Sequence, residues 1–270
     1  MRKFRAGHVS IIGKPNVGKS TLLNYLVNQK ISIVSRKAQT TRWNIRGIKT
    51  CSKYQIIFID TLGLQIKPKI GLNRHMNKEV INSIEFVDII LFVVEAKSWN
   101  KYDENVLKLL NNTKRTKLFL LLNKIDKIKN KKDLLTFINN LSSEQNFDEI
   151  IPVSAIKGTG ITELESLIVK NLPNSEPFYP KKQITDRNER FFAAEFIREK
   201  LIIRLNDEVP HHLSVTIDEF SNNENIIHIN ACIWVEKKGQ KSIVIGKDGK
   251  LLKEVGTSAR LELENLYNKK

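Results

Sequence analysis

The chain has 270 residues and a formal net charge of +16, from 45 Lys and Arg residues against 29 Asp and Glu residues. This length predicts more than one domain, and the charge is compatible with a nucleic-acid partner. The two cysteines, Cys51 and Cys232, are too few and too distant in sequence for a disulfide framework or a cysteine-based metal site. The longest apolar run, Ile89 to Val94, is far shorter than a membrane span, and no long apolar segment follows the basic N-terminus. We therefore expect a soluble, cytoplasmic protein.

Apolar strand-like runs alternate with amphipathic stretches from residue 4 to residue 171. The predicted strands are 7–12, 45–51, 54–59, 89–95, 117–122 and 149–153. The predicted helices are 19–29, 74–84, 102–112, 131–142 and 161–171. Such alternation is typical of an α/β domain with a mostly parallel six-stranded sheet and helices on both faces. Ligands bind beyond the carboxyl ends of such strands, so functional motifs should follow strands directly.

The segment after the first predicted strand has the G-x-x-x-x-G-K-[ST] pattern of a phosphate-binding P-loop. Its backbone N–H groups can surround a polyphosphate, and the following helix directs its positive dipole end at the same anion. Lys19 is expected to neutralise the β- and γ-phosphates, and the Ser20 hydroxyl to hold a magnesium ion. The predicted nucleotide-binding residues of this segment are Gly13, Lys14, Pro15, Asn16, Val17, Gly18, Lys19, Ser20 and Thr21.

Two later segments are candidates for contact with the γ-phosphate. The polar stretch from Lys30 to Asn44 contains threonines that could complete the magnesium shell only when a γ-phosphate is present, so it should order with the triphosphate. An ordinary helix-to-strand loop is the alternative. The D-x-x-G motif that ends the strand at 54–59 predicts magnesium binding through water and a γ-phosphate contact from a glycine N–H. Its candidate residues are Asp60, Thr61, Leu62, Gly63 and Leu64.

The motif N-K-x-D follows the strand at 117–122 and predicts guanine binding. The carboxylate of Asp126 can accept hydrogen bonds from N1–H and the 2-amino group of guanine, a pattern that adenine does not offer. The Ala155 N–H, after the next strand, can meet the guanine O6. A second N-K-x-D at 130–133 follows a charged stretch, so we interpret it as a solvated helix start. The predicted base-site residues are Asn123, Lys124, Ile125, Asp126, Ser154 and Ala155.

Three prolines between residues 172 and 182 predict a semi-extended linker. Beyond it we expect a helix at 188–205, strands at 213–217 and 226–235, and a last helix at about 249–267. Most of the positive charge precedes this region, since residues 1–180 carry a net +14 and residues 181–270 only +2. The global charge is therefore weak support for RNA binding by the tail. We interpret His211, His212, Phe220 and Trp234 as strand-edge surface and core packing rather than as metal ligands or base-stacking groups.

The turn at 246–249 reads G-x-x-G between two helical segments, which is how a KH domain clamps a sugar–phosphate backbone. The helix–strand–strand order before it favours this interpretation over a fortuitous turn. Leu252 and Val255 fit the helix face beneath a groove for single-stranded bases. Residues 237–260 also hold seven Lys and Arg against two Asp and Glu. The predicted RNA-binding residues are Gly246, Lys247, Asp248, Gly249 and Lys250.

The order and spacing of these motifs resemble the TrmE–Era–EngA–YihA–Septin group of GTPases. Within it, the sequence Lys-Ala-Gln-Thr-Thr-Arg at 37–42 and the tail resemble the Era family of bacterial ribosome-assembly GTPases, over nearly the whole chain. The resemblance implies GTP, GDP and Mg²⁺ as ligands and Thr41 as a magnesium ligand, with Thr40 as the alternative. It also implies a type II KH domain, here without the strand and helix that follow its last helix. We therefore expect an incomplete sheet edge or groove wall.

Hydrolysis is expected to be slow because Leu64 stands where Ras-like enzymes carry a water-orienting glutamine. Some relatives use a potassium ion held partly by the P-loop asparagine, and Asn16 matches that position. Potassium stimulation is therefore a hypothesis, with Asn16 and Lys19 as the candidate catalytic groups. Leu62 also replaces the proline that is usual in this family's motif.

Together these features predict a GTP-binding domain at 1–172, a linker at 173–184 and a KH type II-like RNA-binding domain at 185–270. The resemblance implies a monomeric GTP-hydrolysing switch that binds 16S rRNA and the 30S subunit and assists small-subunit assembly. Peripheral contact with the inner membrane surface is a further partner interaction to test. The alternatives are a GTP-liganded RNA chaperone with negligible hydrolysis, and a P-loop kinase or ATPase.

Overall fold

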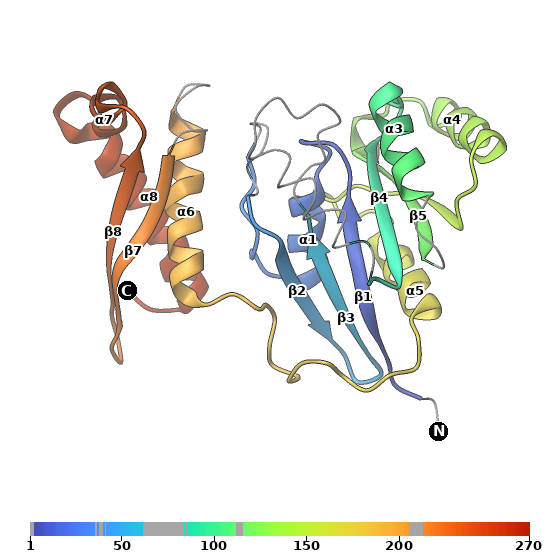
Figure 1. The fold of residues 1–270 in the computed structure, drawn as a ribbon, viewed down its shortest axis with the longest axis horizontal. Coiled ribbons are helices and arrows are strands. Elements are labelled where there is room, and N and C mark those ends of the chain that lie inside the picture. The colour runs from blue at the N-terminus through green and yellow to red at the C-terminus, as the bar shows by residue number, and fades with distance from the viewer. Residues whose placement is uncertain are drawn as a thin grey trace. The chain divides into compact units, whose positions relative to one another are not determined.

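The computed structural model describes residues 3–35, 37, 40, 42–61, 84, 86–111, 116–205 and 213–270. The chain divides into two compact units, drawn in Figure 1. The first comprises Met1–Ser32 and Thr41–Asp186, and the second comprises Ile33–Thr40 and Arg187–Lys270. A short segment from the first half of the sequence therefore belongs to the second unit.

The first unit is built on a six-stranded sheet in the order β2-β3-β1-β4-β5-β6. Among the strand pairs that the structure describes in this sheet, β2–β3 alone is antiparallel, so the predicted mostly parallel α/β sheet is confirmed. The strands are β1 (Arg5–Ile12), β2 (Ile45–Thr50), β3 (Tyr54–Asp60), β4 (Ile89–Glu95), β5 (Lys117–Asn123) and β6 (Glu149–Pro152). The α-helices of this unit within the described residues are α1 (Lys19–Val27), α3 (Lys101–Leu110), α4 (Lys131–Glu144) and α5 (Ile161–Asn171).

The central strands are apolar on both faces because helices cover them. In β4, six consecutive residues from Ile89 to Val94 are buried. Phe92 of β4 and Leu120 of β5 share a buried cluster with Leu107 of α3. The predicted helix at 74–84 lies outside the described residues, apart from its last residue.

The carboxyl ends of the parallel strands lie at one edge of the sheet. The register pairs Asp60 of β3 with Ile11 of β1, and Asn123 of β5 with Glu95 of β4. The polar motifs that follow these strands are therefore brought together by the sheet itself, as expected for this architecture.

The proline-containing segment after α5 remains attached to the first unit. The Ile48 N–H donates to the Ile184 carbonyl at 2.8 Å, and the Gln55 side-chain amide donates to the Tyr179 carbonyl at 2.8 Å. The second unit resumes at Arg187.

The second unit has a two-stranded antiparallel sheet and three α-helices among its described residues. They are α6 (Glu189–Arg204), β7 (Leu213–Asn222), β8 (Ile227–Val235), α7 (Lys238–Ile245) and α8 (Lys250–Tyr267). The sequence prediction ended the first of these strands at residue 217, which was wrong. A bulge between Ile217 and Glu219 shifts the register and lets β7 continue to Asn222. No helix in the described part of the chain is both long and apolar enough to span a membrane.

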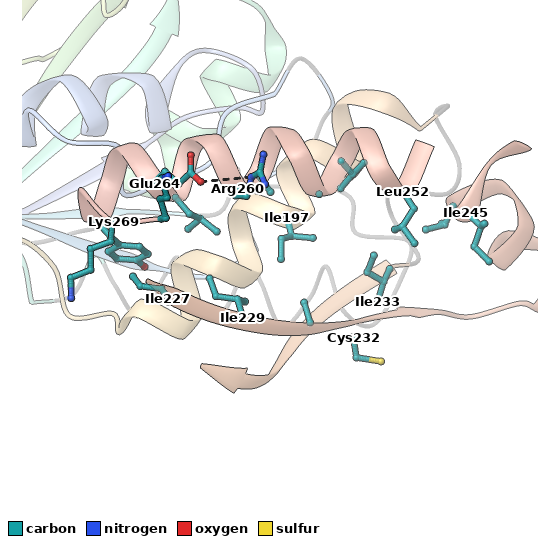
Figure 2. A pocket seen from close by; sticks show the side chains of 18 of the residues that line it. Ile197, Ile227, Ile229, Cys232, Ile233, Ile245, Leu252, Arg260, Glu264 and Lys269 are labelled. Atoms are coloured by element: carbon teal, nitrogen blue, oxygen red, sulfur yellow. Dashed lines mark ion pairs between the residues drawn. The ribbon is translucent and has the colours of Figure 1, made fainter. Parts of the chain in front are cut away.

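Leu201 of α6, Val244 of α7 and Val255 of α8 form the buried core of the second unit with Leu213 of β7. Val255 therefore packs as predicted, whereas Leu252, predicted on the same helix face, is 37% exposed and lines a pocket of this unit (Figure 2). Trp234 departs from the prediction, because it is 57% exposed and donates from Nε1 to the Thr216 hydroxyl at 3.0 Å. It lies on the outer face of the sheet rather than in the core. His211 and His212 lie outside the described residues.

Candidate functional site

The P-loop lies between β1 and α1, where its pattern placed it. Gly18 adopts a φ of 102°, and a Cβ at this position would lie 2.4 Å from Nδ2 of Asn123. Only glycine fits this close approach, because any side chain would both strain the backbone and collide with the amide. The glycine at this position of the motif is therefore required by Asn123, which lies 105 residues further along the chain.

Lys19 is held inside the P-loop. Its Nζ donates to the carbonyl oxygens of Gly13 at 3.1 Å and Lys14 at 3.0 Å, and the residue is only 7% exposed. Burial lowers the pKa of Lys19 to about 8, and the nearby Asp60 carboxylate opposes that shift. An ammonium that is desolvated and bound to neutral carbonyls gains from an incoming phosphate, so Lys19 is preorganised to receive one.

Lys14, which the pattern also assigned to the nucleotide, has a protein partner. Its Nζ lies 3.3 Å from a carboxylate oxygen of the buried Asp103 on α3. Burial raises the pKa of Asp103, and the ammonium of Lys14 opposes the shift. This ion pair ties the P-loop backbone to α3.

Asp60 and Ser20 meet at the predicted magnesium position. The Ser20 hydroxyl donates to Asp60 Oδ2 at 2.8 Å, and the Ser32 hydroxyl donates to the same oxygen at 2.8 Å. Asp60 is fully buried, and burial raises its pKa. Its other oxygen, Oδ1, has no hydrogen-bond partner among the residues that the structure describes. A buried carboxylate oxygen without a partner is costly, and a metal-bound water would satisfy it. The donor set therefore fits Mg²⁺, which prefers carboxylate and hydroxyl oxygens and retains several waters.

Ser32 was not predicted. It is buried and lies between α1 and β2, where no motif marks it. Its contact with Asp60 joins the start of the polar segment to the D-x-x-G strand, and only the three-dimensional fold reveals it.

The predicted guanine-site residues are joined to the P-loop through the side chain of Asn123. Asn123 is 2% exposed; its Nδ2 donates to the Val17 carbonyl at 2.7 Å, and its Oδ1 accepts from the Ala155 N–H at 3.0 Å. The Ser154 hydroxyl donates to Asp126 Oδ1 at 2.5 Å. One asparagine thus connects the phosphate loop with the loop that carries Ala155.

The two N-K-x-D segments, at 123–126 and 130–133, adopt different local structures, as expected. Lys124 adopts a φ of 65° and its Nζ pairs with Glu95 at 2.6 Å, which fixes the turn into the short 3₁₀ helix Ile125–Lys127. Asn130 instead caps α4 by accepting from the Lys132 N–H at 3.0 Å. The interpretation of 130–133 as a solvated helix start is confirmed.

The polar segment before β2 is held by α6. Arg198 donates to the Thr40 carbonyl at 2.7 Å, and Glu199 accepts from the Val34 N–H at 2.8 Å. Arg198 also pairs with Glu195 at 2.6 Å, and both charged side chains are buried. The Thr40 hydroxyl is bonded to the Ser35 hydroxyl at 2.6 Å. Thr40 is thus engaged within the second unit.

Thr41, Leu62, Gly63 and Leu64 lie outside the described residues. Thr61 is described, and its hydroxyl donates to the Ile11 carbonyl at 2.7 Å, which fixes the end of β3 beside β1.

The G-x-x-G turn joins α7 to α8 in the second unit. Gly246 has a φ of 74°, and a Cβ there would lie 2.7 Å from Cβ of Leu251. Asp248 adopts a left-handed φ of 53°, and the Gly249 N–H donates to the Gly246 carbonyl at 3.2 Å. The side chains of Lys247, Asp248 and Lys250 are exposed. The turn presents its backbone and two cations to solvent, as phosphate contact requires.

Comparison with known proteins gives the family. Residues 8–124 match the model of the 50S ribosome-binding GTPases, and residues 208–270 match that of KH domains. GTPase Era of Coxiella burnetii is 48% identical over 270 residues, which cover all of this chain and 91% of the relative. GTPase Era of Haemophilus influenzae is 47% identical over 269 residues, covering 99% and 89%.

Two solved structures of Era agree with the fold. One is Era in complex with MgGDPNP and nucleotides 1506–1542 of 16S ribosomal RNA. The other is a variant of Aquifex aeolicus Era bound to GDP·AlF4⁻. Each has a TM-score of 0.93 and 39% identity, over 98% of this chain and 90% of the solved one. The chain belongs to the Era family of GTPases.

Proposed function

We propose that the first unit binds GTP and GDP with Mg²⁺ and hydrolyses GTP slowly. The observation that carries this proposal is the double hydrogen bond of Asn123, which joins the P-loop at Val17 to the guanine loop at Ala155. A site with these two halves can recognise phosphate and base at once. The complex of Aquifex aeolicus Era with GDP·AlF4⁻ supports hydrolysis.

Each residue has a distinct role in this proposal. The non-proline residues from Gly13 to Thr21 direct backbone N–H groups at the phosphates. Lys19 leaves its carbonyl partners to bind the β- and γ-phosphates. Asp126 accepts the two guanine donors, and the Ala155 N–H serves O6. Ser20, Asp60 and Thr41 would hold Mg²⁺. When bound, Mg²⁺ supplies positive charge that stabilises the transferring phosphoryl group.

A multiple-turnover phosphate-release assay separates a GTPase from an RNA chaperone that uses GTP only as a ligand. Slow continuous release is expected, and binding without turnover would support the chaperone. ATP should compete with GTP poorly, because adenine lacks the donors that Asp126 recognises; effective competition would instead favour a kinase or ATPase.

We further propose that Asn16 holds a potassium ion that substitutes for the missing water-orienting glutamine. Asn16 adopts a φ of 64°, which turns it away from regular helix geometry at the start of the loop. Turnover should be faster in potassium than in sodium buffer at equal ionic strength. Asn16→Gly tolerates this φ and should remove the difference, whereas equal turnover in both salts for the unaltered protein would reject the hypothesis.

We propose that the second unit binds 16S rRNA through Gly246, Lys247, Asp248, Gly249 and Lys250. The KH match and the solved complex of Era with 16S rRNA nucleotides support this assignment. Crosslinking in native lysate should recover 16S rRNA with the unaltered chain and much less with Gly246→Asp. Unchanged crosslinks would remove the turn from the RNA site.

The proposed setting is the cytoplasm, where a monomer acts on the 30S subunit during its assembly. Sedimentation with purified 30S subunits should show GTP-dependent co-migration that Gly246→Asp weakens. Flotation with anionic vesicles tests the inner-membrane contact, and failure to float would remove that partner.

A further inference from the structure

Asp103 is a buried carboxylate whose position is not explained by its role in the helix cap. It lies in the first turn of α3 and is fully buried. Its Oδ2 accepts from the Asn100 N–H at 3.2 Å, which completes the capping box of α3. A capping box requires no burial, and a buried charge costs free energy unless it is paired. The cap therefore explains the residue type, and the burial requires a cation.

That cation is Lys14, the second residue of the P-loop motif. Its Nζ lies 3.3 Å from Asp103 Oδ2, and it donates to the Ser98 carbonyl at 3.2 Å and to the Ser98 hydroxyl at 3.4 Å. The acceptors all belong to α3 or to the connection between β4 and α3. The side chain of Lys14 is 19% exposed. Lys14 is therefore engaged by α3 rather than free to reach a phosphate.

The backbone of Lys14 has a second partner, which is Lys19. The Lys14 carbonyl accepts from Lys19 Nζ at 3.0 Å. One residue thus binds α3 with its side chain and, with its carbonyl, holds the ammonium that is proposed to bind the β- and γ-phosphates. A side chain that is fixed at its tip restricts the orientation of its own backbone. The contact with Asp103 therefore limits the direction of the carbonyl that holds Lys19.

The connection between β4 and α3 is also held by the guanine motif. The Ala96 N–H donates to the Asn123 carbonyl at 2.9 Å, and Lys124 Nζ pairs with Glu95 at 2.6 Å. The same connection therefore contacts the base loop near its start and the P-loop residue Lys14 near its end. Lys14 is attached to a part of the chain that is itself fixed relative to the base site.

We propose that Lys14 and Asp103 are positioning residues, which place the Lys19 ammonium for the phosphates of the bound nucleotide. This inference rests on the proposed GTP binding and adds to it a pair of side chains that act through Lys19. An ammonium that is held in place before the nucleotide arrives loses less conformational freedom on binding. The pair therefore strengthens binding of diphosphates and triphosphates and leaves recognition of the base unchanged.

Attraction by charge alone predicts the opposite result for Asp103→Asn. Removing a negative charge beside an anionic ligand should strengthen binding. Loss of positioning should weaken binding, because Lys14 no longer has an anionic partner on α3. Asparagine has nearly the same shape and retains an oxygen for the Asn100 N–H, so the cap of α3 is kept. The direction of the change therefore separates the two explanations.

The test measures the affinities of GDP and GMP for the full chain in the presence of Mg²⁺, by displacement of a fluorescent GDP. Asp103→Asn and Lys14→Met should each weaken GDP binding about tenfold. GMP lacks the phosphates that Lys19 is proposed to bind, so its affinity should change less than about twofold. If Asp103→Asn leaves GDP binding unchanged or strengthens it, the proposal is overturned. Equal losses for GDP and GMP would indicate general damage to the fold and would also overturn it.

Lys97→Met is the matched control, because it removes the same charge from the connection between β4 and α3. The side chain of Lys97 is 43% exposed and pairs with Asp133 rather than with the P-loop. GDP affinity should change less than about twofold. A tenfold loss in this variant would mean that charge alone explains Lys14→Met, and the proposal would fail. If the unaltered chain binds neither GDP nor GTP, the proposed function fails; if it binds both and the variants match it, only the positioning role fails.

Discussion

The guanine-nucleotide site and the G-x-x-G turn are held by different kinds of interaction. At the nucleotide site, Asn123 is buried and bonded to residues 106 and 32 positions away, so three separate loops must be in register. At the turn, the geometry comes from the local φ values of Gly246, Asp248 and Gly249, and the side chains between the glycines are exposed. The first site therefore depends on the folded core, whereas the second depends on a few backbone angles. The following substitutions test this contrast.

The largest effect is expected for Asp126→Asn. Asparagine presents an N–H₂ group where guanine also donates, so hydrogen bonds to a charged group worth about 1.5–3 kcal/mol each are lost. GTP affinity should fall by about 10²- to 10⁴-fold, as measured by calorimetry. Asp133→Asn, in the second N-K-x-D, is the matched control and should leave affinity unchanged. A similar loss in both variants would contradict the assignment of the guanine site.

Arg198→Ala should destabilise the second unit by about 3–5 kcal/mol, because it leaves the Glu195 carboxylate buried without its partner. It also removes the donor to Thr40 that holds the segment Ile33–Thr40 on α6. Urea unfolding followed by hydrogen exchange in α6 measures the loss. The double substitution Glu195→Leu with Arg198→Met should recover most of it, since a buried pair can be replaced by apolar residues of similar volume. If the double substitution recovers none of the lost stability, the loss comes from the missing hydrogen bond to the Thr40 carbonyl and not from the unpaired Glu195 carboxylate.

Asn123→Ala removes both hydrogen bonds that join the P-loop to the guanine loop. Leaving two buried partners unsatisfied should cost about 2–4 kcal/mol and lower both GTP affinity and the melting temperature of the nucleotide-free protein. Asn130→Ala removes only a helix cap, at about 0.5–2 kcal/mol, and should not change GTP affinity. If Asn123→Ala weakens nucleotide binding without affecting the free protein, the asparagine contacts the ligand rather than organising the site.

Of these substitutions, Gly246→Ala should cost the least free energy, and its effect should be confined to the G-x-x-G turn. The positive φ and the 2.7 Å approach to Leu251 force the turn to shift, at a cost of about 1–3 kcal/mol. RNA affinity should fall about tenfold while GTP affinity stays unchanged. Gly239→Ala, in α7 where a Cβ meets nothing within 4 Å, is the control and should bind RNA normally. If Gly246→Ala also lowers GTP affinity, the effect of the substitution extends beyond the turn, and the contrast is wrong.

The sequence located most of the candidate site, because its motifs encode local backbone requirements. Glycines at fixed spacing, a lysine and serine at a strand-to-helix junction, and a carboxylate after a strand each predict a contact with phosphate, metal or base. The two N-K-x-D copies could be told apart from their flanking residues alone, since only one follows an apolar run. The length of β7 and the exposure of Trp234 were predicted wrongly, because a β-bulge and the choice of sheet face depend on the packing partner.

The sequence by itself determined that the chain has a P-loop α/β domain with guanine specificity followed by a KH-like unit, because strand alternation and loop motifs are local properties. Only the tertiary structure decided how the loops are joined. The contacts of Asn123 with Val17, of Ser32 with Asp60 and of Arg198 with Thr40 connect residues from 28 to 158 positions apart. No local pattern specifies such pairs, since each arises when packed elements bring distant polar groups within hydrogen-bonding distance.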